Sequence, residues 1–429
     1  MIAILPALIV LSTPTAVALT LDEAMAAAES HSPALGLVRE NTEQALALRQ
    51  QAYALISPKV VGQATYTIND KEIVLDFTEM IPEDYKDLLG IEADPITLQR
   101  KTVWEGYATV VQPLFNASSL PALRGTYSNV RAAEATERQA RQQIRAGTAK
   151  VYYGLAVARA MEQLATRAIE SAKSHLALAD QQVAVGLAPE RARLQAQLAL
   201  ARAERDLAQA HEGVVTAQQA FTDLTGLPAD TDVALPEAPP PMPGSLDEAL
   251  AQADAPELDT AEANWRSAQY QTNATRASWL PTLDARYTYV WTQNTGFSGE
   301  NHLWMLVFQA DWTLWDGGAR LAQTRSYASQ ARQAELLMQQ SVTENQTAVR
   351  TAWERFERGQ AALQAAEREQ ALAEENLRLA ETAFASGGLT WLEAEDARLG
   401  LHAAQSAVLQ ERAQRDLAAI DLAVAMGRW

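Results

Sequence analysis

Residues 281–316 read PTLDARYTYVWTQNTGFSGENHLWMLVFQADWTLWD, and this stretch decides the fold. Apolar and polar side chains alternate through two runs of about ten residues each, which is the pattern of a transmembrane β-strand. Residues 294–300 separate the runs and predict a turn. We expect the aromatic face of this hairpin to contact lipid, and its members are Tyr287, Tyr289, Trp291, Trp304, Phe308 and Trp312. The alternative is a water-soluble hairpin packed on its own helices, although so dense an aromatic face would leave a large exposed apolar patch.

Weaker versions of the same alternation occur in residues 60–68 and 104–110, so one chain supplies four predicted strands. Four strands cannot close a barrel, and lipid does not tolerate an open sheet edge. Two chains would pool eight strands, whose interior is filled by side chains, whereas three would pool twelve and leave room for a pore. A cyclic trimer is therefore the better prediction for a conduit.

The chain contains an internal duplication. The sequence LDEA at 21–24 returns at 246–249, LFN at 114–116 returns as LWD at 314–316, and LTG at 224–226 returns as AMG at 425–427. Chance similarity would not keep such markers in the same order. We predict repeat 1 at 19–226, repeat 2 at 245–429 and an extended, proline-rich linker at 227–244.

Each repeat predicts a helix, a β-hairpin and a long helical hairpin. The β-hairpin and the helical hairpin occupy 59–112 and 117–226 in repeat 1, and 282–315 and 317–427 in repeat 2. The longest helices would extend roughly 100 Å at 1.5 Å per residue. Because their surfaces mix alanine with charged residues, a hollow helical tube with water on both sides fits them, with a solid coiled-coil bundle as the alternative. The predicted fold class is mainly α with a small β part.

Composition excludes several functions. The formal net charge of −18 argues against nucleic-acid binding, which needs a basic face. The absence of cysteine excludes disulfides and thiolate metal sites. The five histidines lack metal-binding spacing, and there is no phosphate-binding loop or nucleophile elbow. We therefore predict no enzyme, no cofactor and no metal site.

Two further segments have their own interpretation. Residues 1–18 are uncharged, apolar and end in a small-residue cleavage pattern, which predicts a signal peptide; an anchor helix is the alternative, but the apolar run is too short to span a bilayer. Residues 70–94 carry nine acidic and two basic side chains. We expect them in an extracellular loop at 70–100, where solvation of the surface is the preferred role and a charged outer mouth or divalent-cation binding are the alternatives.

With these elements in place, the sequence resembles the outer membrane factor family, the TolC-like trimeric channels of Gram-negative efflux pumps and type I secretion systems. The resemblance covers essentially the whole mature chain. The residues that carry it are Leu19–Ala24, Trp279–Pro281, Leu314–Gly318, Val185–Leu187 and Phe384 with Gly387.

The resemblance implies a duplicated fold with four transmembrane strands per chain, a twelve-stranded barrel in the outer membrane and a long α-helical tunnel crossing the periplasm. It implies a passive homotrimeric exit duct in outer membrane lipid. A periplasmic adaptor would couple the duct to an inner-membrane transporter of RND, ABC or MFS type. A soluble periplasmic coiled-coil adaptor or scaffold is the alternative function.

The resemblance also assigns residues to the periplasmic entrance. The adaptor-docking helix tips match Val185, Gly186, Leu187 and Ala188 in repeat 1, and Ser386, Gly387, Gly388 and Leu389 in repeat 2. Glu393 and Asp396 match a pair of acidic positions that ring the entrance and would favour cations. Repeat 1 has Ala192 and Gln195 at the equivalent places. An ordinary solvated acidic face that includes Glu395 is the alternative interpretation.

Overall fold

The computed structural model describes residues 19–76, 79, 95–186, 188–236, 241–295, 297–386 and 388–429. The predicted signal peptide at 1–18 and most of the acidic insertion lie outside the described residues. The chain divides into two compact units. The helical unit comprises Met1–Glu40, Glu134–Asp259 and Gln339–Trp429, and the strand unit comprises Asn41–Ala133 and Thr260–Met338.

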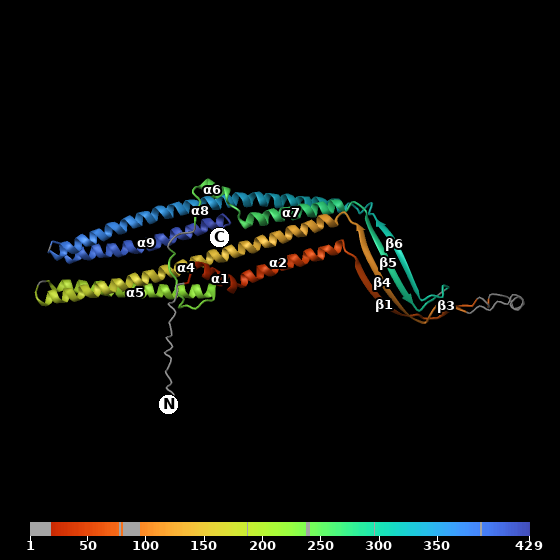
Figure 1. The fold of residues 1–429 in the computed structure, drawn as a ribbon, viewed down its shortest axis with the longest axis horizontal. Coiled ribbons are helices and arrows are strands. Elements are labelled where there is room, and N and C mark those ends of the chain that lie inside the picture. The colour runs from red at the N-terminus through yellow and green to blue at the C-terminus, as the bar shows by residue number, and fades with distance from the viewer. Residues whose placement is uncertain are drawn as a thin grey trace, which may run out of the picture. The chain divides into compact units, whose positions relative to one another are not determined.

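Long helices make up most of the described chain (Figure 1). The helices of repeat 1 are α1 (Leu21–His31), α2 (Pro33–Ala52), the short 3₁₀ helix η1 (Tyr53–Leu55), α4 (Ser119–Ala184) and α5 (Glu190–Thr225). Those of repeat 2 are α6 (Leu246–Ala251), α7 (Pro256–Ala277), α8 (Ala319–Ala385) and α9 (Trp391–Ala425). Both repeats therefore show the expected order of short helices, strands and a long helical hairpin.

Local sequence accounts for where the first helices begin and end. Thr20 and Glu23 form a capping box at the start of α1, because each side chain accepts a hydrogen bond from the other residue's backbone N–H. The chain breaks between the first two helices at Ser32, since α1 ends at His31 and α2 begins at Pro33. Proline is well tolerated in the first turn of a helix, where its missing N–H has no partner to lose.

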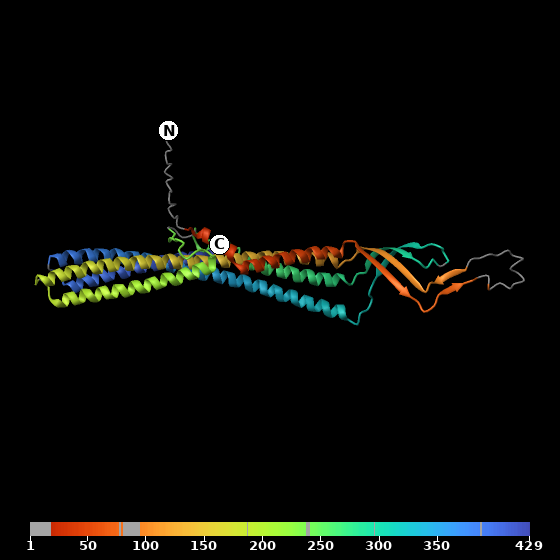
Figure 2. The ribbon, with the colours of Figure 1, turned by 90° about the horizontal axis from the view of Figure 1, so that it is seen from below.

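The helical unit has its main core where α4, α5 and α9 pack together with α1. Five large side chains of this core, Tyr152, Tyr153, Leu155, Phe221 and Ile420, are at most 2% exposed. Small residues let the helices approach closely: a Cβ added at Gly359 of α8 would lie 3.2 Å from Cα of Arg415 on α9. Figures 1 and 2 show the α4–α5 and α8–α9 hairpins running side by side, with their tips at the same end.

The duplication is visible in how the last helix of each repeat ends. Gly226 after α5 and Gly427 after α9 both have left-handed backbone, with φ of 70° and 76°. A Cβ on Gly226 would come within 2.7 Å of His31 Nδ1, and one on Gly427 within 2.1 Å of the Asp254 carbonyl oxygen. Each helix therefore stops against a segment from the start of its own repeat, and only glycine fits there.

The strand unit contains a four-stranded antiparallel sheet in the order β1-β4-β5-β6. Its strands are β1 (Lys59–Ile68), β4 (Thr102–Phe115), β5 (Thr282–Thr292) and β6 (His302–Asp311). The hairpins of the two repeats join through β4 and β5, where Ala108 lies opposite Tyr289. β1 and β6 form the edges of the sheet and have no strand neighbour on their outer side among the described residues.

The two described ends of the acidic insertion form short β-strands. β2 (Ile73–Leu75) and β3 (Ile96–Gln99) pair as a separate two-stranded antiparallel sheet with a register shift after Ile73. Gln99 Nε2 donates to the Lys71 carbonyl, 3.1 Å away, at the base of this ribbon. The segment expected as a loop at 70–100 therefore contains a short two-stranded ribbon, and its extracellular placement stays a prediction.

The proline-rich segment is not a free linker along its whole length. Val233 is 6% exposed and belongs to the main core, and the N–H of Leu19 donates to the Asp232 carbonyl at 2.8 Å. The hydroxyl of Tyr152 on α4 donates to the carbonyls of Leu19 and Ala234. Residues 232–234 are therefore held in the helical unit: Val233 is buried in the core, and the carbonyls of Asp232 and Ala234 accept hydrogen bonds.

None of the described helices is long and apolar enough to cross a membrane.

Candidate functional site

The first helical tip joins α4 to α5. Gly186 has φ of 72°, and its N–H donates to the Val183 carbonyl at 3.0 Å. The N–H of Ala188 donates to the Gln182 carbonyl at 3.2 Å, so the last carbonyls of α4 are satisfied within the turn. Val185 is 69% exposed. Leu187 lies outside the described residues.

The second tip joins α8 to α9 with similar geometry. The N–H of Gly388 donates to the Ala383 carbonyl at 2.8 Å, and that of Ser386 to the Thr382 carbonyl at 3.2 Å. Leu389 is half-buried in this turn, and Gly387 lies outside the described residues. Glycine-rich helix ends of this kind are explained by helix termination alone.

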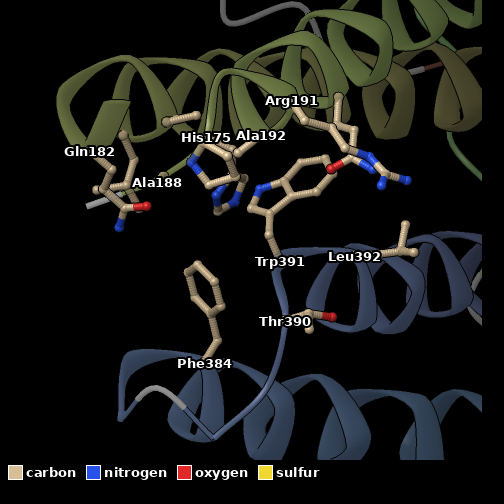
Figure 3. A pocket seen from close by; sticks show the side chains of 13 residues that line it. His175, Gln182, Ala188, Arg191, Ala192, Phe384, Thr390, Trp391 and Leu392 are labelled. Atoms are coloured by element: carbon tan, nitrogen blue, oxygen red, sulfur yellow. The ribbon is translucent and has the colours of Figure 1, made fainter. Parts of the chain in front are cut away.

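A cavity of about 460 Å³ separates the two tips (Figure 3). Trp391, the first residue of α9, points into it toward His175 and Arg191 of the first hairpin, and Phe384 of α8 lies at its other side. Ala192 and Gln195 also line this cavity. These two residues are the repeat-1 counterparts of Glu393 and Asp396. They line the cavity between the two helical hairpins, where a charged side chain would be desolvated.

Glu393 and Asp396 are both exposed in the first turns of α9. The Glu393 carboxylate accepts from the backbone N–H of Thr390 at 2.8 Å and from its hydroxyl at 2.7 Å, which completes a capping box. The backbone hydrogen bond from Thr390, followed by that from its hydroxyl, lowers the pKa of Glu393. Glu393 therefore stays ionised and is held in one orientation.

Glu395, which the solvated-face interpretation counts with these two, is different. It accepts a hydrogen bond from Arg398 at 2.8 Å, and both side chains of this pair are largely buried. Arg398 also donates to Glu381 of α8 at 3.2 Å, so it joins the two helices of the hairpin. The free acidic charge of this turn is therefore carried by Glu393 and Asp396, because Glu395 is neutralised locally.

Two histidines that the sequence analysis did not assign lie beside Arg398. His175 of α4, His402 of α9 and Arg398 line a second cavity of about 290 Å³ between α4, α5 and α9. Burial, with the nearby Arg398 charge as the second cause, lowers the pKa of both imidazoles. The buried Nδ1 of His402 has no hydrogen-bond partner among the residues that the structure describes. No sequence signal identifies this cluster, because His175 is more than 200 residues from Arg398.

The strand residues predicted to contact lipid share one face, with one exception. Tyr289 lies opposite Trp304, and Tyr287, Trp291 and Phe308 fall in the same alternation. Trp304 and Phe308 are 67% and 65% exposed. The register across β1, β4 and β5 extends this aromatic face to Tyr66 and Trp104, whose rings lie 4.8 Å apart.

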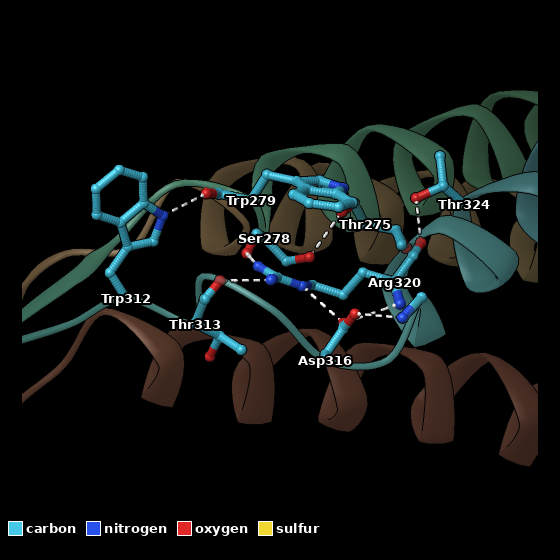
Figure 4. Close-up of polar contacts among 9 residues, drawn as sticks. Thr275, Ser278, Trp279, Trp312, Thr313, Asp316, Arg320 and Thr324 are labelled. Atoms are coloured by element: carbon cyan, nitrogen blue, oxygen red, sulfur yellow. Dashed lines mark hydrogen bonds and ion pairs between the residues drawn. The ribbon is translucent and has the colours of Figure 1, made fainter.

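Trp312 is the exception, because β6 ends at Asp311. Its indole N–H donates to the Trp279 carbonyl at 3.1 Å, which turns the chain out of the strand (Figure 4). Arg320 then holds the junction: it donates to Asp316 and to the carbonyls of Ser278 and Thr313, and stacks on Trp279 at 4.4 Å. The alternation predicted through Leu314 therefore stops where these side chains hold the start of α8.

The described residues contain no group of histidine, aspartate and glutamate side chains able to hold a metal ion. The arrangement consists of two exposed helical tips, a pair of exposed carboxylates beside one of them, and a sheet with one aromatic face.

The fold matches several solved outer membrane proteins. CusC is 17% identical and matches with a TM-score of 0.77 over 95% of this chain and 91% of that chain. VceC of Vibrio cholerae is 19% identical, with a TM-score of 0.74 over 95% and 96% of the two chains. The MtrE outer membrane channel of Neisseria gonorrhoeae is 17% identical, with a TM-score of 0.72 over 95% and 88%.

At these identities the likeness establishes the fold. Among curated proteins no sequence matches the chain. The family model described as outer membrane efflux protein matches residues 24–227 and 247–428, which is nearly all of both repeats. The chain therefore belongs to the outer membrane efflux protein family, whose members form the outer membrane exit duct of efflux pumps.

Proposed function

We propose that three copies of this chain pool their sheets into one twelve-stranded barrel and work as the passive exit duct of a tripartite efflux pump or type I secretion system. The observation that carries this proposal is the sheet itself. It has an exposed aromatic face and two edge strands, β1 and β6, which have no strand neighbour on their outer side among the described residues. In lipid such edges must be paired, and a second and a third copy can pair them.

The dimensions of the sheet support this arrangement. β1, β5 and β6 have 10 or 11 residues, the length that a tilted strand needs to cross a bilayer. Exposed aromatic side chains lie near both ends of the sheet: Tyr66, Trp104 and Trp291 at one end, and Trp279, Trp312 and Trp315 at the other. Aromatic girdles at the two interfaces are typical of membrane barrels.

The helical hairpins supply the periplasmic part of the duct in this proposal. A periplasmic adaptor docks on the two tips, at Val185–Ala188 and Ser386–Leu389, and an inner-membrane transporter of RND, ABC or MFS type supplies the energy. The chain itself needs no cofactor and performs no chemistry. A soluble adaptor is not favoured, because the family consists of outer membrane channels.

Glu393 and Asp396 form an acidic ring at the periplasmic entrance in this proposal. Both are exposed, Glu393 is held by its capping box, and neither is paired with a basic side chain as Glu395 is. Three copies would bring six carboxylates around one opening. Such a ring attracts cations and repels anions, and the effect weakens as salt screens it.

Cysteine cross-linking tests the pooled sheet directly, because the chain has no native cysteine. Single cysteines along β1 are combined with single cysteines along β6 in one chain, and the membrane fraction is oxidised. We expect a subset of pairs, spaced two residues apart along the strands, to give covalent trimers on denaturing gels. Pairs between β1 and β5 serve as controls, because β4 separates these strands. Failure of every β1–β6 pair would contradict the pooled barrel.

A further inference from the structure

Glu105 of β4 lies on the inner face of the sheet, which is the face opposite the aromatic one. Three successive cross-strand rows of this face carry Val61, Thr109, Thr288 and Met305; Gln63, Tyr107, Val290 and Leu303; and Thr65, Glu105 and Thr292. Glu105 is the only ionisable carboxylate or basic residue in these rows. The surrounding positions carry hydroxyl, amide or apolar side chains, so a single charge dominates this part of the face.

The Glu105 carboxylate is held in place by two strands. The Tyr107 hydroxyl, from the same strand, donates to Oε2 at 2.8 Å. The Thr292 hydroxyl of β5 donates to Oε1 at 3.2 Å, and in turn accepts from the backbone N–H of Asn294 at 3.1 Å. Each carboxylate oxygen therefore keeps a lone pair free for a passing cation while its orientation is fixed.

The other charged residues in this alternation lie further along the strands: Lys101 four residues before Glu105 on one side, and Lys59, Arg286, Asp284 and Asp311 on the other. Arg286 pairs with Val111, in the same row as Lys59, and Asp311 lies two rows further toward the helices. Six residues of β4 separate Glu105 from that row, which is about 20 Å along an extended strand. This is about twice the Debye length at 0.1 M salt, and the four residues to Lys101 span about 13 Å, which also exceeds it. Among the described residues no basic side chain forms an ion pair with Glu105.

We propose that Glu105 forms an acidic ring in the outer part of the barrel and makes the duct prefer small cations there, independently of the entrance. This inference rests on the proposed trimer, in which the inner face lines the lumen and three-fold symmetry puts three Glu105 carboxylates at one level. A ring of fixed carboxylates selects by sign where no other charge of the lumen lies within a Debye length of it. It would make the duct charge-selective at both ends.

Ion selectivity of the purified full-length protein in planar bilayers tests this ring. With a KCl gradient around 0.1 M, we expect Glu105→Gln to lower the ratio of K⁺ to Cl⁻ permeability by about threefold, and by less at 1 M KCl because of screening. Glu105→Asp keeps the charge and should keep most of the selectivity. Thr109→Val changes a residue on the same face of the same strand that does not contact Glu105, so it controls for disturbance of the strand and should leave the selectivity unchanged.

The side from which a trivalent cation such as hexaamminecobalt(III) blocks the current separates this ring from the entrance. We expect Glu105→Gln to weaken block from the extracellular side, and Glu393→Gln with Asp396→Asn to weaken block from the periplasmic side. If conducting channels of Glu105→Gln keep the original selectivity and extracellular block, the outer ring is wrong while the duct stands. If the unmodified protein never conducts, the duct and the ring both fail.

Discussion

Arg398 of α9 reaches across the second helical hairpin and donates to Glu381 of α8, with 3.2 Å between Nη2 and Oε1. The same guanidinium donates to Glu395 at 2.8 Å, and its side chain is only 11% exposed. It is the described ion pair that joins α8 to α9 next to the tip. The link lies directly behind the proposed docking surface and entrance ring, so it bears on how firmly the second tip is held.

Removal of this cation should loosen the hairpin. We expect Arg398→Gln to lower the free energy of unfolding by about 1–3 kcal/mol, because Glu395 would be left largely buried without its partner. Urea unfolding followed by circular dichroism measures the change. Arg378→Gln is the matched control: Arg378 pairs with Glu375 on the exposed surface of α8, and such pairs contribute less than about 1 kcal/mol. Equal effects of the two variants would contradict a structural role for Arg398.

Acid should weaken the same region through His175 and His402. Burial lowers the pKa of each imidazole in the folded protein, so the unfolded chain binds more protons as pH falls through 6.5. Their contribution to stability is therefore complete above pH 6.5 and is lost as pH falls toward the lowered pKa values. The other charged groups around them are Arg167 of α4, Arg202 and Asp206 of α5, Glu381 of α8, and Glu395, Asp396 and Arg398 of α9.

Unfolding of the double variant His175→Gln, His402→Gln at pH 7.5 and pH 5.5 measures this contribution. We expect the variant to lose less stability between the two pH values than the unmodified protein does. Ser171→Ala, which lines the same cavity and removes no titratable group, is the matched control and should leave the pH dependence as it is. An identical pH dependence in the double variant would show that these two histidines do not titrate in the unfolding transition.

Alanine substitutions at three glycines with similar backbone conformation but different surroundings should destabilise the protein to different degrees. Gly186, Gly226 and Gly427 all have φ near 70°, which costs an alanine about 1–2 kcal/mol. Gly186 has nothing within 4 Å of an added Cβ, Gly226 faces the His31 ring, and Gly427 faces the Asp254 backbone. We expect alanine at 186 to be mildest, at 226 intermediate and at 427 most destabilising, since a side chain can move and a backbone segment cannot.

Thermal unfolding of the three alanine variants in parallel gives the order directly. Because the backbone strain is common to all three, the differences report the packing of each helix end against the start of its own repeat. A Gly186→Ala variant as unstable as Gly427→Ala would contradict that packing.

Neutralisation of the entrance pair should change selectivity without changing the fold. Gln at position 393 can still complete the capping box with Thr390, so Glu393→Gln with Asp396→Asn removes charge and keeps α9 capped. We expect the K⁺ to Cl⁻ permeability ratio to fall about twofold or more at low salt. Asp180→Asn, an exposed carboxylate near the end of α4, controls for general loss of negative charge near the tips. Unchanged selectivity in the double variant would reject the entrance ring.

The hydrophobic periodicity of the sequence and its helix-breaking residues predict the helices and strands of this protein well. The alternation in 283–292 and 304–314 predicts β5 and β6, although β6 begins at His302 and ends at Asp311. The predicted helical hairpins at 117–226 and 317–427 begin within two residues of α4 and α8. These signals are local, because a strand's alternation and a helix's ends depend on nearby side chains. The aromatic face follows from the same rule.

The features that the sequence did not predict depend on contacts between distant residues. Trp312 continues the alternation, but its bond to the Trp279 carbonyl ends the strand. Val233 lies in a proline-rich segment that reads as a linker, yet it packs in the main core. Arg398 pairs with Glu381 of α8 and lines one cavity with His175 of α4 and His402 of α9. No spacing in the sequence indicates that these residues are neighbours.

Single-channel recording of the purified full-length protein in planar bilayers tests the central claim, that copies of this chain pool their sheets into one open duct. We expect discrete conductance steps that favour cations at low salt, and we expect the conducting protein to migrate as a trimer. We also expect an oxidised β1–β6 cysteine pair to leave these steps intact, because the cross-link lies within the barrel wall. Membrane-inserted trimer that gives no conductance steps at any voltage or pH would contradict the claim.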